Sequence, residues 1–167
     1  MDIEKPWLSS FPWDEVQSLN QTLCQQQSTA YQANRTLETA RELWEKAATQ
    51  RMSLPEVLDV CRHCYEMAPF TFNNGNTFAT VGKNLITDWV NSLPAVEGQI
   101  VANTVGHYIA GMVSRKELLT VLRHFETSWK TYASAREIVP STRGVPAKQP
   151  QTRASAGLEG AMLTPPQ

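Results

Sequence analysis

Two cysteines three residues apart are the first groups in this chain that could do chemistry. Cys61-Arg62-His63-Cys64 has a spacing found in metal and thiol-redox motifs. A structural zinc site needs four ligands, and a redox pair usually sits at a helix N-terminus, which lowers the thiol pKa. Both cysteines instead share a helical face with Leu58, where thiols behave as small hydrophobic groups. We therefore expect a structural role, no metal and no cofactor, with metal binding and redox exchange as alternatives.

The remaining polar residues do not assemble into a catalytic set. His107 lies in a mostly apolar run and His124 beside charged residues. The sequence shows no Ser/His/Asp arrangement typical of a catalytic triad and no pair of acidic residues whose spacing indicates acid–base catalysis. It also lacks a Walker-type phosphate loop. The sequence therefore names no catalytic residue, and it favours a non-catalytic protein without excluding an enzyme.

The stretch 68–78 combines turn-forming residues with three aromatic side chains, and it lies between two strongly patterned helical segments. Asparagine amides can donate and accept hydrogen bonds, and unpaired N–H groups at the start of the next helix favour an anion. One interpretation is a ligand site; the other is that Asn76 caps the helix while the phenylalanines plug the end of the bundle. The candidate ligand-binding residues are Phe70, Phe72, Asn73, Asn74, Gly75 and Asn76.

This turn resembles the central motif of the Fic/Doc family, whose members read His-Pro-Phe, two variable residues and then Gly-Asn-Gly-Arg. Four residues fall at matching positions: Pro69, Phe70, Asn74 and Gly75. The family transfers nucleotide-derived groups to protein hydroxyls with the histidine as general base, and Ala68 stands at that position here. Asn73 replaces a glycine, and Asn76 replaces the phosphate-binding arginine. The resemblance therefore implies an inactive relative that binds a small ligand or nucleotide.

Apolar residues recur at helical spacing through most of the chain, and no segment has a convincing strand pattern. We expect an all-α bundle of about five helices, near residues 12–49, 54–68, 77–93, 96–113 and 114–135. The domain organisation that follows is an N-terminal extension (1–10), a helical domain (11–138) and a disordered Pro/Ser/Gly-rich tail (139–167).

The first helical region carries an apolar stripe that alternates by three and four residues, which is typical of a heptad seam. A continuous helix of this length would span about 50 Å, which is longer than the rest of the domain should be wide. A break near Asn34 is therefore an alternative to one continuous helix. The seam either packs on its own domain or recruits a second helix or chain. Its main residues are Val16, Leu19, Leu23, Leu37 and Trp44.

Small residues at every fourth position in the fourth helix predict a close approach to another backbone: Gly98, Ala102, Gly106 and Ala110. The helical faces also predict a set of core residues: Leu58, Cys61, Tyr65, Phe78, Val81, Leu85, Trp89, Val105, Ile109, Leu118, Leu122, Phe125 and Trp129.

Composition limits the function classes. The chain has 167 residues, of which 41 % are hydrophobic and 19 % charged, and its net charge is −1. Nucleic acid is therefore an unlikely partner, three cysteines do not make a disulfide framework, and no apolar run is long enough for a membrane span. We expect a cytoplasmic, non-catalytic interaction or scaffold protein that uses the first helix or the aromatic turn to bind a protein partner or itself. The alternative is a Fic/Doc-like ligand-binding domain.

Overall fold

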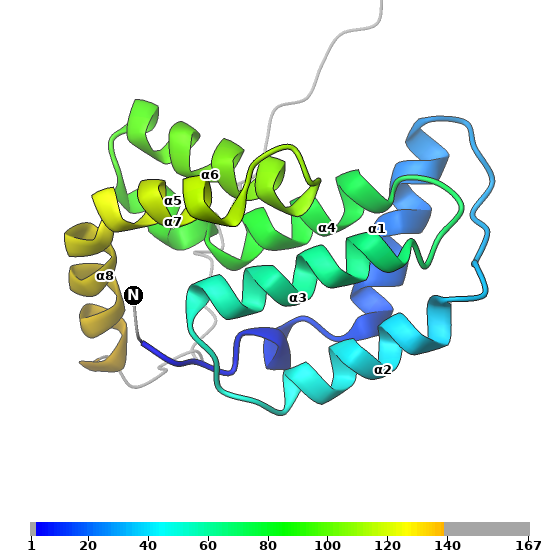
Figure 1. Cartoon of the computed structure of the whole chain (residues 1–167), viewed down its shortest axis with the longest axis horizontal. Coiled ribbons are helices and arrows are strands. Elements are labelled where there is room, and N and C mark those ends of the chain that lie inside the picture. The colour runs from blue at the N-terminus through cyan, green and yellow to red at the C-terminus, as the bar shows by residue number, and fades with distance from the viewer. Residues whose placement is uncertain (1–2, 139–167) are drawn as a thin grey trace, which may run out of the picture.

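Helices make up the regular structure of residues 3–138, the part of the chain that the computed structural model describes (Figure 1). The expected all-α class is confirmed, and the described residues contain no strand beyond two isolated bridges. The predicted tail, 139–167, lies outside them. In chain order the helices are the 3-10 helix η1 (Trp7–Ser10), α1 (Trp13–Gln26), α2 (Leu37–Ala48), α3 (Leu54–Met67), α4 (Asn74–Leu85), α5 (Thr87–Ser92), α6 (Ala95–Ile109), α7 (Arg115–His124) and α8 (Glu126–Ile138).

Three of the expected helices are each divided in two, which raises the number of α-helices in the described residues to eight. The first is interrupted over residues 27–36, and the others break at the single residues Ile86 and Phe125. Both break residues have ψ near 0°, and both are buried. The apolar pattern therefore continues across each break although the helix axis does not, and α8 turns sharply away from α7 (Figure 1).

Two helix starts follow directly from capping boxes. The backbone N–H of Ser53 donates to the Glu56 carboxylate over 2.7 Å, and that of Ser114 donates to Glu117 over 2.8 Å. These hydrogen bonds satisfy donors that a helix N-terminus leaves unpaired. The Ser53 and Ser114 hydroxyls also donate to these carboxylates. The hydroxyls first, and the backbone N–H groups second, hold the pKa of Glu56 and of Glu117 below the ordinary value.

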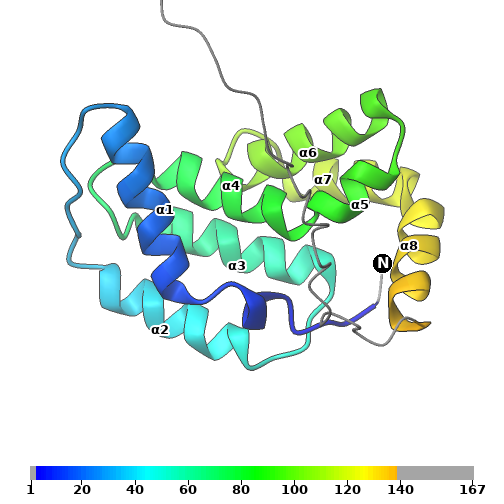
Figure 2. The same cartoon turned by 180° about the vertical axis from the view of Figure 1, so that it is seen from behind.

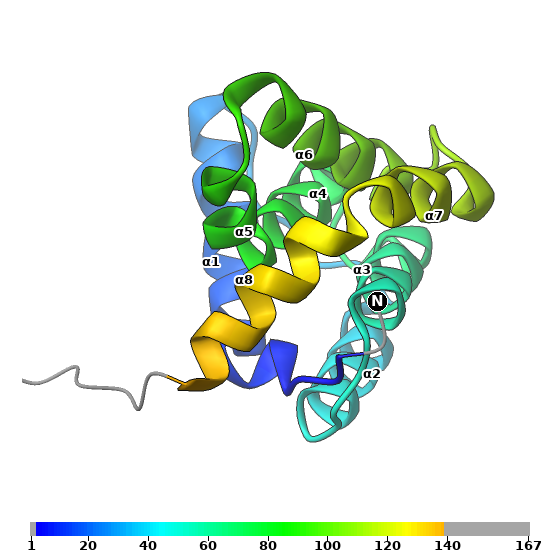
Figure 3. The same cartoon turned by 90° about the vertical axis from the view of Figure 1, so that its left-hand side faces the viewer.

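Helices α3 and α4 run through the middle of the fold, with α6 packed on α4 and α2 packed on α3 (Figure 1). Helix α1 crosses α4 on the face that is nearer the viewer in Figure 2. Segment 3–10 starts close to α8, since Lys5 lies over the Trp129 and Tyr132 rings, at the end of the molecule that faces the viewer in Figure 3. This arrangement buries α3 on several sides.

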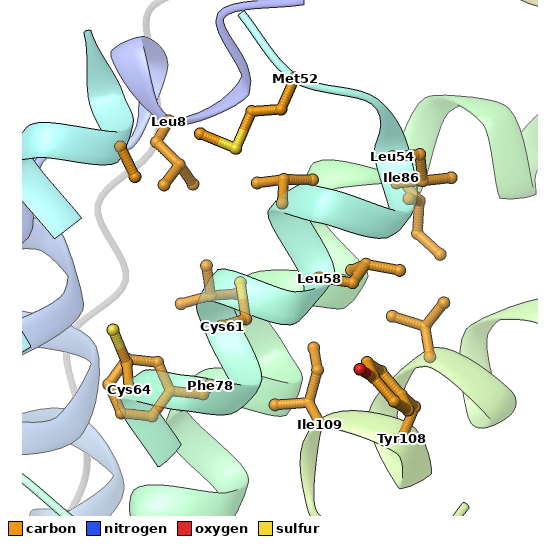
Figure 4. Packing of buried hydrophobic residues seen from close by; sticks show 14 of the residues in the cluster. Leu8, Met52, Leu54, Leu58, Cys61, Cys64, Phe78, Ile86, Tyr108 and Ile109 are labelled. Carbon is orange, nitrogen blue, oxygen red and sulfur yellow. The ribbon is translucent and has the colours of Figure 1, made fainter. Parts of the chain in front are cut away.

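The core is centred on α3, whose Leu54, Leu58, Cys61 and Cys64 are buried (Figure 4). Leu8, from the segment expected to be an extension, is also buried. The predicted core residues are buried with two exceptions, Tyr65 and Leu85, which are partly buried and pack against the core.

The predicted close approach to another backbone occurs at Gly98. A Cβ atom there would lie 2.8 Å from the carbonyl oxygen of Val90, so any side chain would push α5 and α6 apart. At Gly106 the neighbour is instead a side chain, because a Cβ atom would meet Lys83 Cε at 2.6 Å.

Candidate functional site

The stretch 68–78, which covers the turn between α3 and α4 and the start of α4, directs two of its three aromatic side chains inward. Phe70 is 0 % exposed, and its ring lies 6.1 Å from that of Trp13 and 6.4 Å from that of Phe78. Phe78 is also fully buried. Phe72, between them in sequence, is 45 % exposed. The turn therefore anchors the helix end and leaves one aromatic ring at the surface.

The carbonyl groups of this turn are bound by the connection between α1 and α2. The Asn34 backbone N–H donates to the Pro69 carbonyl over 2.8 Å. The Asn34 side-chain amide donates to the carbonyls of Ala68 (2.8 Å) and Phe70 (3.0 Å). The Thr71 hydroxyl donates to Asn34 Oδ1 over 3.0 Å. One asparagine thus joins two loops that are distant in sequence.

Two further asparagines have their amides engaged inside the fold. Asn74 Oδ1 accepts from the Phe70 backbone N–H over 3.0 Å, and its Nδ2 donates back to the Phe70 carbonyl. The buried Asn20 donates to the carbonyl of Phe72 and to the hydroxyl of Thr77, over 2.9 Å in each case. Of the candidate residues, Phe70 and Asn74 are therefore occupied by structural contacts.

The other candidates lie at the first turn of α4. Asn73 precedes the helix with φ 63°, and its amide donates to Cys24 Sγ over 3.5 Å. The expectation that Asn76 caps this helix is wrong, because α4 begins at Asn74 and Asn73 holds the cap position. Asn76 is exposed inside the first turn, 3.5 Å from Asn73 Oδ1, and Gly75 is partly buried. Phe72, Asn73, Gly75 and Asn76 thus remain at or near the surface.

The predicted seam faces the protein's own core. Val16 and Trp44 are buried, and Leu19 and Leu37 are partly buried against the core. Leu23 is partly buried near the end of α1. The seam is also discontinuous, because residues 27–36 leave the helix and Ser28 has a positive φ of 52°. A single exposed coiled-coil stripe over this region is therefore not formed.

The Cys61–Cys64 pair is enclosed by the core. Burial raises the pKa of both thiols, that of Cys64 to about 12. His63, between them in sequence, is exposed on the other side of the helix. Within residues 3–138 no group of His, Cys, Asp and Glu side chains is arranged to hold a metal ion. At neutral pH these thiols stay protonated, and protonated thiols are poor nucleophiles.

A polar cluster that the sequence analysis did not identify joins α3 to α6 and α7. Asp59 accepts hydrogen bonds from the Tyr108 hydroxyl and from Arg115 Nη2, the latter over 3.0 Å. The Arg62 guanidinium lies 4.9 Å from the centre of the Tyr108 ring. Burial and the neighbouring Asp59 raise the pKa of Tyr108 to about 12, so its hydroxyl is a donor and not a base at neutral pH. The cluster is a clamp between helices.

The outer side of α6 exposes residues none of which is an aspartate, glutamate, lysine or arginine. We call it the α6 face and define it by its exposed residues: Ala95, Val96, Gln99, Ile100, Asn103 and His107. Val96 is 74 % exposed and Ile100 is 45 % exposed, and Met112, just after the helix, is 68 % exposed.

A groove between α5 and α6 adjoins this face. It has a volume of about 350 Å³, and no charged residue lines it: Val90, Asn91, Leu93, Ala95, Gly98, Gln99 and Ala102. The sequence carries a signal for this face, since Asp88 and Glu97 are the sole charged residues from Asn84 to Ser114.

Comparison of the chain with protein-family models, with curated proteins and with solved structures finds no match. None of the described helices has the length and apolar character needed to cross a membrane.

Proposed function

We propose that this chain is a non-catalytic helical interaction protein that binds through the α6 face. The observation that supports the proposal is that the residues of the α6 face are exposed and include no charged side chain. Val96 and Ile100 are exposed on a helix whose one charged residue, Glu97, is partly buried. Protein interfaces are depleted of charge at their centres, and clustered exposed apolar groups commonly mark a binding surface.

The partner that this surface fits is a second copy of the chain. In a two-fold contact the same patch meets itself, and a patch without charge brings no like charges together. Val96 and Ile100 of one copy would face the uncharged groove between α5 and α6 of the other. Gln99 and Asn103 supply amides that can hydrogen-bond across the contact. The proposal places self-association on α6 and not on the predicted seam of α1 and α2, where Val16 and Trp44 are buried.

The proposal includes a cytoplasmic location. The chain has an odd number of cysteines, and Cys24, Cys61 and Cys64 are all free thiols. Free, buried thiols persist in a reducing compartment. Expression of the full chain with a fluorescent tag, followed by fractionation into cytosol and membranes, tests this part.

Light scattering over a range of protein concentrations tests the interaction. We expect the average mass of the wild type to rise from monomer towards dimer, and we expect Val96→Lys combined with Ile100→Lys to stay monomeric at every concentration. Leu23→Lys, a matched charge on the first helix, should leave the mass profile unchanged. Circular dichroism verifies that each variant is folded. A wild type that remains monomeric, or a dimer that survives the α6 substitutions, would contradict the proposal.

A further inference from the structure

A pocket lined by aromatic rings lies where segment 3–10 meets α8, and it is separate from the α6 face. Its volume is about 430 Å³, and its walls include Lys5, Trp7, Phe11, Asp88, Trp129 and Tyr132. The Trp7 and Trp129 rings stack with their centres 5.6 Å apart, and the Tyr132 ring lies 5.9 Å from Trp129. Rings from α8 and from the N-terminal segment, whose backbones are drawn in Figure 3, therefore form an aromatic wall.

The wall is held in place by backbone contacts to the α2–α3 connection. Lys5 and Met52 exchange two backbone hydrogen bonds, of 2.9 Å and 3.1 Å. The Trp7 indole N–H donates to the Met52 carbonyl over 2.8 Å. Trp129 is buried, with 1 % of its surface exposed. The rings are thus fixed before any ligand arrives, which lowers the entropy cost of binding.

The pocket already places one cation among its rings. Lys5 Nζ lies 5.4 Å from the centre of the Trp129 ring and 5.9 Å from the centres of the Trp7 and Tyr132 rings. Ring faces carry negative electrostatic potential and attract cations within about 6 Å. A lysine ammonium is strongly hydrated, whereas a methylated ammonium loses water more easily and presents methyl groups to the rings.

Asp88 lines the same pocket, and its negative charge favours a cation there. We propose that this pocket binds a small organic cation of the methylated-ammonium class and that the Lys5 ammonium is its built-in competitor. The chemistry common to such ligands is a trimethylammonium group, whether it belongs to a free molecule or to a modified lysine side chain. The inference is independent of the proposed function, because no residue of the α6 face lines this pocket.

Tryptophan fluorescence of the full chain, recorded at constant ionic strength, tests the proposal. The probes are tetramethylammonium, choline and trimethyl-lysine, and 3,3-dimethylbutanol serves as the neutral isostere of choline. We expect a saturable change with the cations and at least about tenfold weaker binding of the neutral compound. A stronger response to choline than to trimethyl-lysine would identify a free small molecule as the better source, and the reverse order a modified side chain.

Three variants of pocket residues and one control variant test which side chains affect cation binding. Lys5→Met keeps the aliphatic stem but removes the competing ammonium, so the cations should bind at least about threefold more tightly. Tyr132→Leu and Asp88→Asn should each weaken binding by about fivefold or more, and the exposed Lys116→Met should change nothing. If Tyr132→Leu does not fold, Lys5→Met and Asp88→Asn still decide. The proposal is overturned by the absence of saturable binding, by equal binding of the neutral isostere, or by weaker cation binding in Lys5→Met.

Discussion

The 68–78 turn and the α6 face show opposite relations between residue type and exposure. The turn carries the phenylalanines and asparagines that are typical of a binding site, yet Phe70 is buried and Asn74 is bound to the backbone of its own loop. Helix α6 carries the small residues that are typical of internal packing, yet Val96 and Ile100 on its outer side are exposed.

This difference shows that residue type alone is a poor guide to a surface. Asparagine can satisfy the backbone hydrogen bonds of a helix junction, and phenylalanine can fill its interior, as readily as either can bind a ligand. An uncharged helix side becomes informative once its exposure is known, since solvent-facing positions are usually polar or charged. The predictions below test this contrast between the turn and the α6 face.

The largest effect is expected within the turn itself. Phe70→Ala removes a fully buried ring from contact with Trp13 and Phe78, so the free energy of unfolding should fall by about 3–5 kcal/mol. Phe72→Ala, two residues away and 45 % exposed, should change it by less than about 0.5 kcal/mol. Urea unfolding followed by circular dichroism measures both values. Equal losses in the two variants would show that the turn is not anchored as described.

The next largest effect is expected for the hydrogen bonds that Asn34 makes to the turn. Asn34→Ala removes the donor to the Ala68 and Phe70 carbonyls, and we expect a loss of about 1–3 kcal/mol in the free energy of unfolding. Asn76→Ala is the matched control, because Asn76 is exposed and makes one long contact of 3.5 Å with Asn73. A cost at Asn76 as large as that at Asn34 would reverse the assignment of structural and accessible residues.

At Gly98, where α5 and α6 approach closely, we expect alanine to destabilise the protein although helices usually prefer alanine to glycine. Gly98→Ala places a Cβ atom against the Val90 carbonyl, so we expect a net loss of about 1–2 kcal/mol despite the gain in helix propensity. Gly75→Ala should be neutral or slightly stabilising, since its Cβ atom would lie 3.7 Å from the Tyr65 ring, an ordinary contact distance. Thermal and urea unfolding of the two variants compare them directly, and a stabilised Gly98→Ala would disprove the close approach.

The smallest effect is expected at the clamp beneath α6. Tyr108→Phe loses the hydrogen bond to Asp59, which should cost about 1 kcal/mol at neutral pH. Because the folded protein raises the pKa of Tyr108 to about 12, this group's contribution to stability is complete below about pH 10 and declines as the pH rises towards 12. Tyrosinate absorbance should show a late transition that Tyr108→Phe lacks. If the transition that the variant loses lies at the ordinary tyrosine pKa of about 10, the clamp is contradicted.

The sequence was sufficient for the helical class and for most of the core, since a 3.6-residue pattern survives even where a helix breaks. It could not show the breaks at Ile86 and Phe125, because neither glycine nor proline marks them and both residues are buried. The role of Asn34 was hidden because its carbonyl partner in Ala68 is 34 residues away. The resemblance of the turn to the Fic/Doc motif stays a prediction.

Disulfide trapping tests the central claim most directly, because it reports which surfaces meet. All three native cysteines are buried, so a single new thiol is the reactive one. Asn103→Cys lies on the α6 face, and Thr120→Cys is an exposed control on α7. Under mild oxidation our account predicts a disulfide-linked dimer for Asn103→Cys and a monomer for Thr120→Cys. Equal cross-linking of the two variants, or none in Asn103→Cys at concentrations where the wild type associates, would contradict it.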